Sequence, residues 1–124
     1  MSAKVVPEPA RFFRELSLHD VTITQVSYDL DIRHLEIRTD DLNWNIEGTE
    51  GYRPRPCVLH FAGVTAFELS MGRDRFHTSI NSEPAILNDA SAITRNGVTR
   101  MDFVFSTSEH WSVEFVTLEI EDDL

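Results

Sequence analysis

The chain has 124 residues, of which 41% are hydrophobic and 26% charged, a balance typical of one globular domain and not of a disordered chain. Eleven basic and twenty-one acidic side chains give a net charge of −10, which argues against nucleic acid as a partner because phosphate would be repelled. A single cysteine excludes a disulfide scaffold, and no apolar run reaches the roughly 18 residues that a membrane-spanning helix needs.

The first residues contain no apolar segment typical of a secretory signal, so we expect a cytoplasmic protein. A lone thiol also suits a reducing compartment. Residues 1–9 are expected to form a flexible arm, and residues 10–124 a single β-rich domain.

One short helix is predicted directly after the arm. Phe12, Phe13 and Leu16 recur at helical spacing. Pro9 suits the first turn, because the N–H group that proline lacks has no helical acceptor there. After this segment the hydrophobic period falls from about 3.6 residues to 2, which indicates strands.

Three strands are predicted next. Residues 18–28 are rich in Val, Ile and Thr, and their alternation slips by one position near Gln25, which predicts a bulge. Residues 31–34 are the expected hairpin connection to a strand over 35–38, although they lack glycine. Alternation then predicts a third strand over 42–47.

Loops and strands alternate in the middle of the chain. Residues 48–56 contain two glycines and two prolines and are predicted to be a loop. The apolar strand region 57–69 follows, and Gly63 is expected to bend it. A turn over 71–74 and a strand over 76–80 come next.

The last third begins with an ambiguous segment, 82–92, which fits either a helical turn or strands. Asn96 and Gly97 are the strongest hairpin signal, because both residues tolerate positive φ. A turn is predicted at 107–109, and large side chains alternate before and after it: Met101, Phe103 and Phe105, then Trp111, Val113 and Phe115. After Phe115 the alternation continues in the opposite phase, with Val116, Leu118 and Ile120. Together these elements predict a mainly β fold, either an antiparallel β-sandwich or a curled, barrel-like sheet, with one short N-terminal helix.

No catalytic or metal-binding motif is recognisable. The carboxylates are expected on solvated faces and in turns, and Cys57, which follows Pro56, is expected in the core rather than in catalysis. The histidines lack metal-ligand spacing and are expected at the surface or half-buried in strands: His19, His34, His60, His77 and His110. Only a metal site assembled in space from separate strands would escape this reasoning. We therefore expect no catalytic residue, no cofactor and no metal.

Seven residues are candidates for ligand binding: Arg53, Arg55, Arg73, Arg75, His60, Trp44 and Trp111. The four arginines would form an anion site if their two loops met in space. The alternative is that they pair with the many carboxylates.

The segments Leu18-His-Asp-Val-Thr-Ile, Tyr28-Asp, Leu35-Glu-Ile and Leu59-His-Phe-Ala-Gly-Val64 carry a resemblance. Their pattern is similar to that of small β-rich bacterial domains of unknown function, some of which are classed as immunity proteins of toxin systems. They cover about half of the chain and consist mainly of strand alternation. The resemblance implies a partner-binding, non-enzymatic role and no catalytic residues.

The charge and the lack of a reactive centre favour a non-catalytic, acidic protein-binding domain, such as a bacterial immunity-type inhibitor of a basic partner. The alternative is a small-molecule-binding or enzymatic β-barrel-like domain, with a pocket built from Trp44, Tyr52, His60, Arg75 and Trp111. Exposed strand edges would make a homodimer a third outcome.

Overall fold

The computed structural model describes residues 4–15, 21–44, 54–69, 85–105 and 110–123. These residues form one helix, α1 (Pro9–Glu15), and nine strands. The strands are β1 (Lys4–Val5), β2 (Thr22–Asp29), β3 (His34–Asn43), β4 (Pro54–Ala62), β5 (Ala66–Leu69), β6 (Ala85–Arg95), β7 (Val98–Phe105), β8 (His110–Phe115) and β9 (Thr117–Asp122).

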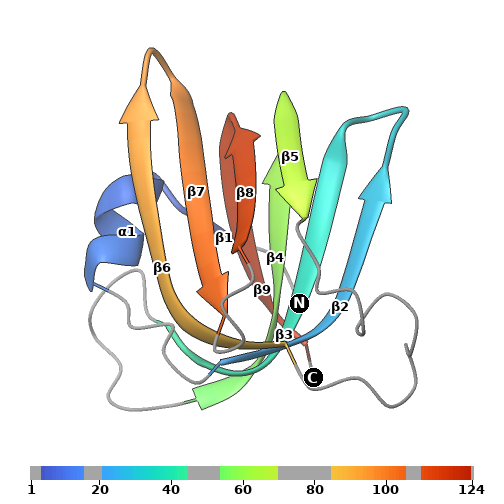
Figure 1. The fold of residues 1–124 in the computed structure, drawn as a ribbon, viewed down its shortest axis with the longest axis vertical. Helices are drawn as coiled ribbons and strands as arrows, with labels where there is room; N and C mark the ends of the chain where they lie inside the picture. Colours follow the sequence, from blue (N-terminus) through green and yellow to red (C-terminus); the bar gives the residue numbers. More distant parts are fainter. Residues whose placement is uncertain (1–3, 16–20, 45–53, 70–84, 106–109, 124) are drawn as a thin grey trace.

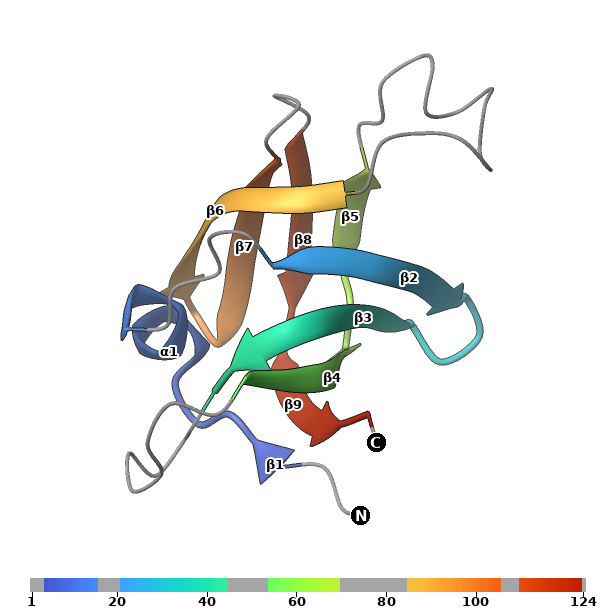
Figure 2. The same cartoon turned by 90° about the horizontal axis from the view of Figure 1, so that it is seen from below.

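The strands form two antiparallel sheets that pack as a β-sandwich (Figure 1). The five-stranded sheet has the order β1-β9-β4-β3-β2, and the four-stranded sheet has the order β6-β7-β8-β5. A short pairing between Thr22–Ile23 of β2 and Ala85–Ile86 of β6 joins the two sheets at one corner. Within the described residues β1 and β5 are the free edges, so the sheets do not close into a barrel. Figure 2 shows the strands of the two layers crossing. The predicted fold class is confirmed.

Alternate side chains of each strand fill the space between the sheets. Among the fully buried residues are Leu35 and Ile37 of β3, and Phe61 of β4. Every large residue predicted to alternate in β7 and β8 is buried as well. The helix α1 packs against β6 (Figures 1 and 2), and it contributes Phe13, of which 3% is exposed. Its first residue is Pro9, as predicted.

Two sharp corners carry the chain between the layers. At Gly63 the chain leaves β4 for β5 with a φ of +64°, and at Val116, which is 51% exposed, it passes from β8 to β9. The corners contact each other, because Val116 N–H donates a hydrogen bond to the carbonyl of Ala62 at 3.0 Å. The bend predicted at Gly63 and the change of phase after Phe115 are therefore parts of one feature.

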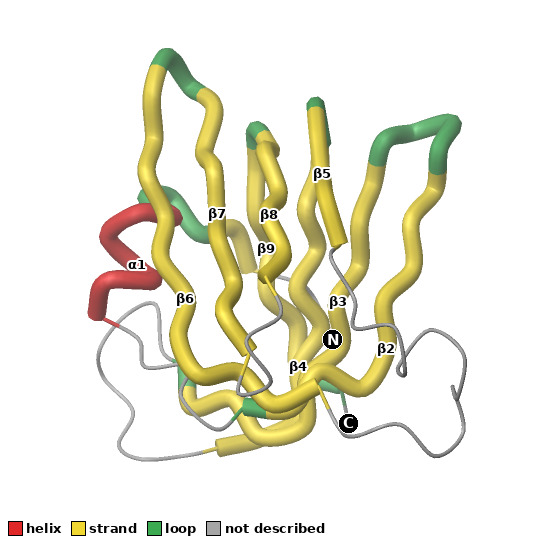
Figure 3. The backbone as a smooth tube through the Cα atoms, in the orientation of Figure 1, coloured by secondary structure: helices red, strands yellow, loops and turns green. Residues whose placement is uncertain are grey.

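The two hairpin turns, β2–β3 and β6–β7, lie at the same end of the molecule (Figure 3). Asn96 and Gly97 have φ values of 53° and 79°, which confirms the predicted tight turn. The β2–β3 connection lacks glycine, and Arg33 takes the positive φ, 52°, in its place. The predicted bulge appears as a shift of pairing between Ile23 and Gln25.

Three parts of the structure differ from the sequence-based expectations. Part of the arm expected over residues 1–9 is a strand, because Lys4 and Val5 pair with β9. The strand predicted over 35–38 continues in β3 to Asn43, which includes the first two residues of the strand predicted over 42–47, and the pairing with β4 shifts between Thr39 and Leu42 instead of ending. A strand can absorb such an irregularity without a turn.

The loop predicted over 48–56 ends earlier than expected. Residues Pro54 to Pro56 are extended and begin β4, since the fixed φ of proline is compatible with the end of a strand. The ambiguous segment becomes β6 from Ala85 onwards. The features predicted over 71–74, 76–80 and 107–109 lie outside the described residues, as do residues 18–20 and 45–53.

Candidate functional site

The solvent-facing side of the five-stranded sheet, here called the outer face, carries most of the candidate chemistry. In β3, Leu35 and Ile37 point into the core, so His34 and Glu36 point outward. Glu36 is paired in register with His60 of β4, and β9 lies on the other side of β4. Antiparallel pairing therefore brings side chains from three strands together on this face.

Three of these side chains, His34, Glu36 and His60, form what we call the imidazole cluster. The Nε2 atom of His34 lies 3.2 Å from Nδ1 of His60. Oε1 of Glu36 lies 3.5 Å from the same Nδ1 and 3.9 Å from Nε2 of His34. The side chains are 27%, 31% and 16% exposed, in the order His34, Glu36, His60, so the cluster is half-buried and open on one side.

Two further residues hold the cluster in place. The Nε2 atom of His60 lies 3.1 Å from Oε1 of Glu121 in β9. Arg38 approaches the other carboxylate oxygen of Glu36, Oε2, at 3.9 Å, and donates a hydrogen bond to Asp123 at 2.8 Å. That bond from Arg38 to Asp123 raises the pKa of the guanidinium. The outer face is therefore an ordered network of charged and ionisable groups.

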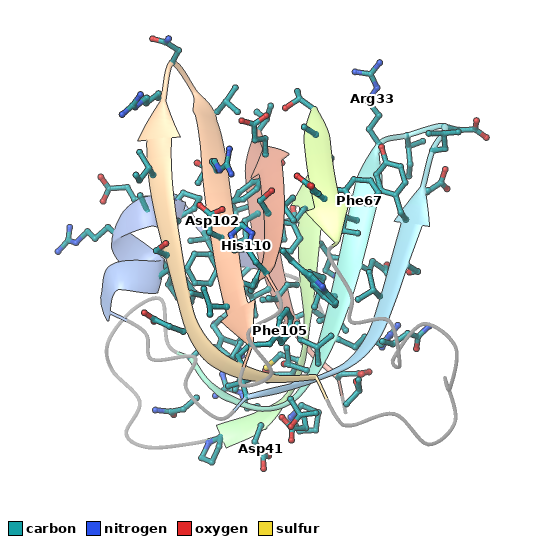
Figure 4. The ribbon with its side chains drawn as sticks, viewed as in Figure 1. Arg33, Asp41, Phe67, Asp102, Phe105 and His110 are labelled. Atoms are coloured by element: carbon teal, nitrogen blue, oxygen red, sulfur yellow. The ribbon has the colours of Figure 1, made fainter. Side chains whose placement is uncertain are left out.

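A shallow depression lies beside the cluster, at the end of the β2–β3 hairpin. It has a volume of about 560 Å³ and is lined by Ser27, Tyr28, Asp29, Leu30, Ile32, His34 and Glu36. Leu30 and Ile32 are 78% and 67% exposed, which is unusual for large apolar side chains. The turn is ordered by the N–H of Asp31, which donates a hydrogen bond to Asp29 at 3.0 Å. Arg33 extends from its tip (Figure 4).

Two of the sequence candidates, Arg55 and Trp44, meet in a buried contact with Asp122. Nε of Arg55 lies 2.8 Å from Oδ1 of Asp122, and Nε1 of Trp44 donates to the same oxygen at 3.1 Å. The guanidinium carbon lies 4.7 Å from the centre of the Trp44 ring. Only 8% of the Arg55 side chain is exposed, so this group is a structural ion pair with a cation–π contact. Of the two alternatives considered for the arginines, an anion site or pairing with carboxylates, Arg55 follows the second, because it pairs with Asp122.

The other candidates are dispersed or lie outside the described residues. Trp111 packs edge-on against Phe105 in the core, with ring centres 4.6 Å apart. His60 belongs to the outer face, as described above. Tyr52 and the remaining arginines, Arg53, Arg73 and Arg75, lie outside the described residues. The three described members of the alternative small-molecule pocket, Trp44, His60 and Trp111, thus have different neighbours.

Cys57 is completely buried in β4, in agreement with the core position expected for a small, semi-apolar side chain. Its thiol donates to the carbonyl of Arg55 at 3.2 Å. Burial raises the pKa of the thiol from 9.0 to about 12, which favours the neutral thiol over the reactive thiolate at neutral pH.

We expect the native protein not to react with iodoacetamide at pH 8, and to react fully in concentrated urea. Because the unfolded thiol ionises above about pH 9 and the folded thiol only near pH 12, the stability that Cys57 contributes is lost as the pH rises from 9 to 12. The Cys57→Ala variant should lack this part of the pH dependence. Native labelling as fast as labelling in urea would contradict the prediction.

Sequence reasoning did not single out His34 and Glu36. Their spacing of two residues is the only local signal, since it places both side chains on one face of a strand. Many pairs in a β-rich chain share that spacing, so it does not identify a site without the neighbouring strand.

The helix of the described residues, α1, has 7 residues, far fewer than the roughly 18 that a membrane-spanning helix needs. No protein family and no curated protein matches this sequence. The structure is similar to the crystal structure of an uncharacterized protein from Neisseria gonorrhoeae, with a TM-score of 0.57 and 10% sequence identity. The match covers 83% of this chain and 91% of that chain. At this identity the likeness shows that the two proteins share a fold, and that the fold occurs in a bacterial protein.

Proposed function

We propose that this chain is a non-catalytic binding domain that docks a basic protein through the end of the β2–β3 hairpin. The observation that carries the proposal is the exposure of Leu30 and Ile32, at 78% and 67%, beside the depression. Large apolar side chains surrounded by polar groups are typical anchors of a protein interface. We call Leu30 and Ile32 with Asp29, Asp31 and Glu36 the docking surface.

The charge around these anchors supports a basic partner. Asp29 and Asp31 flank Leu30 in the sequence, and Glu36 lines the same depression. Arg33 is the cation of the turn, so acidic groups outnumber basic ones at this end of the sheet. With a net charge of −10 on the whole chain, a positively charged partner would be attracted from a distance and oriented before contact. An immunity-type inhibitor of a basic toxin is the form of this function that the sequence resemblance implies.

The test uses immobilised protein and lysate from the source organism. Wild-type protein is expected to retain a basic protein whose affinity falls as the salt concentration rises, because exposed charges are screened. The double variant Leu30→Ser/Ile32→Ser should bind that protein about a hundredfold more weakly, since two buried anchors contribute about 1.4 kcal/mol each.

The matched control is the double variant Ile93→Ser/Val104→Ser, because these apolar residues of the four-stranded sheet are also exposed, at 60% and 40%. It should bind like the wild type. Equal binding by the Leu30→Ser/Ile32→Ser protein, or an affinity that salt does not change, would contradict the proposal. Light scattering on the purified chain tests the alternative of a homodimer. A dimer that Leu30→Ser/Ile32→Ser disrupts would show that the two apolar side chains mediate self-association, which would contradict docking of a basic partner.

A further inference from the structure

We propose that the imidazole cluster is a binding site for one divalent transition-metal ion of the Zn²⁺ type. The evidence is the arrangement of three atoms: His34 Nε2, His60 Nδ1 and Glu36 Oε1, separated by 3.2, 3.5 and 3.9 Å. The point equidistant from three atoms with these separations lies about 2.1 Å from each of them. Zinc binds imidazole nitrogen at about 2.0–2.1 Å and carboxylate oxygen at about 2.0–2.2 Å, so an ion at this point would have ordinary bond lengths to all three atoms.

A hydrogen bond accounts for the contact between the two ring nitrogens, but not for the position of Oε1 of Glu36. One proton at most can lie between the two ring nitrogens, which are 3.2 Å apart. Oε1 of Glu36 lies at 3.5 and 3.9 Å from them, which is too far for a good hydrogen bond with either. An ion at the shared point would satisfy all three atoms at once.

The neighbours of the cluster resemble the residues that hold metal ligands in place by hydrogen bonds and ionic contacts in known metal sites. When His60 donates its Nε2 proton to Glu121, 3.1 Å away, its Nδ1 atom presents a lone pair to the cluster. Arg38 lies beside Oε2 of Glu36, at 3.9 Å, and this contact leaves Oε1 turned towards the imidazoles. The hydrogen bond to Glu121 therefore orients a ligand atom towards the shared point, and the longer Arg38 contact places a positive charge beside the other carboxylate oxygen of Glu36.

The donor set also selects the kind of ion. Two imidazoles and one carboxylate suit Zn²⁺, Co²⁺, Ni²⁺ and Cu²⁺, whereas Mg²⁺ and Ca²⁺ prefer oxygen ligands alone. The partial exposure of His34 and Glu36, 27% and 31%, leaves a fourth coordination position open to water. The site is complete within one chain. It shares Glu36 with the docking surface, but metal binding requires no partner protein and is tested separately.

The test is a titration of the tag-free, EDTA-washed protein with Zn²⁺ by calorimetry, and with Co²⁺ by visible absorption. We expect one ion per chain, and no competition from Mg²⁺. The variants His34→Ala and His60→Ala each remove a ligand and should bind about a hundredfold more weakly or worse, and Glu121→Gln about tenfold more weakly through its effect on His60.

The matched control is His110→Ala. His110 is an exposed histidine of the four-stranded sheet that contacts one carboxylate, Asp102, at 3.1 Å (Figure 4). This variant should bind like the wild type, and circular dichroism should show that all variants remain folded. Absence of saturable binding to the wild type, or equal binding by the double variant His34→Ala/His60→Ala, would overturn the proposal.

Discussion

Replacing Asp122 by alanine is expected to lower the free energy of unfolding by about 3 kcal/mol or more. The substitution removes the carboxylate that faces Arg55, a guanidinium whose side chain is 8% exposed, and it also removes the acceptor of Trp44 Nε1. A buried charge that loses its counter-charge keeps the cost of desolvation without the attraction. Urea denaturation, followed by tryptophan fluorescence, measures the change.

The matched control is the neighbouring residue, Asp123. Its carboxylate pairs with Arg38 at the same short distance, 2.8 Å, but the two side chains are 34% and 39% exposed. Solvent screens such a pair, so Asp123→Ala should cost less than about 1 kcal/mol. If the two variants lose equal stability, burial does not increase the contribution of the Arg55–Asp122 pair to the free energy of unfolding.

The second large effect is expected at Gly63, the corner between β4 and β5. Its φ of +64° disfavours any side chain, and a Cβ atom there would lie 2.9 Å from both Cβ and Cγ2 of Val116. Cβ of Val116 is bonded directly to the backbone of the other corner, so rotation of the Val116 side chain cannot move this atom away. We expect Gly63→Ala to lose about 2–4 kcal/mol, from backbone strain and overpacking together. Thermal and urea denaturation provide the measurement.

Gly97 separates these two contributions. Its φ is +79°, similar to that of Gly63, but nothing lies within 4 Å of an added Cβ. Gly97→Ala should therefore lose only the backbone part, about 1–2 kcal/mol. A loss at Gly63 no larger than the loss at Gly97 would show that the contact between the corners adds no strain.

Much of the fold was predictable because its signals are local. The alternation around Met101 and Trp111 identifies buried faces, and Asn96-Gly97 identifies a turn, without knowledge of any distant residue. The bulge at Gln25 was equally visible, since a slip in alternation requires one extra residue. These local features predict a mainly β fold, and the open edges of the two described sheets decide for the sandwich over the barrel-like sheet.

Boundaries were less predictable where the chain departs from a simple rule. Pro54 and Pro56 suggest a loop, yet β3 provides a template on which they extend into β4. The turn before His34 lacks glycine, and Arg33 adopts a left-handed conformation that its side chain disfavours. In both places the contacts of the neighbouring strands outweigh the local preference.

By itself the sequence determined that the protein is acidic and rich in β-strands, and it determined which side chains lie on the same face of each predicted strand. The tertiary structure alone decided which of these residues meet. The two-residue alternation shows which side chains share a face of a strand, but it does not show which strand lies beside it. That pairing depends on how the inner faces of the sheets pack. His60 therefore meets His34, 26 positions away, and Glu121, 61 positions away, only because β4 lies between β3 and β9.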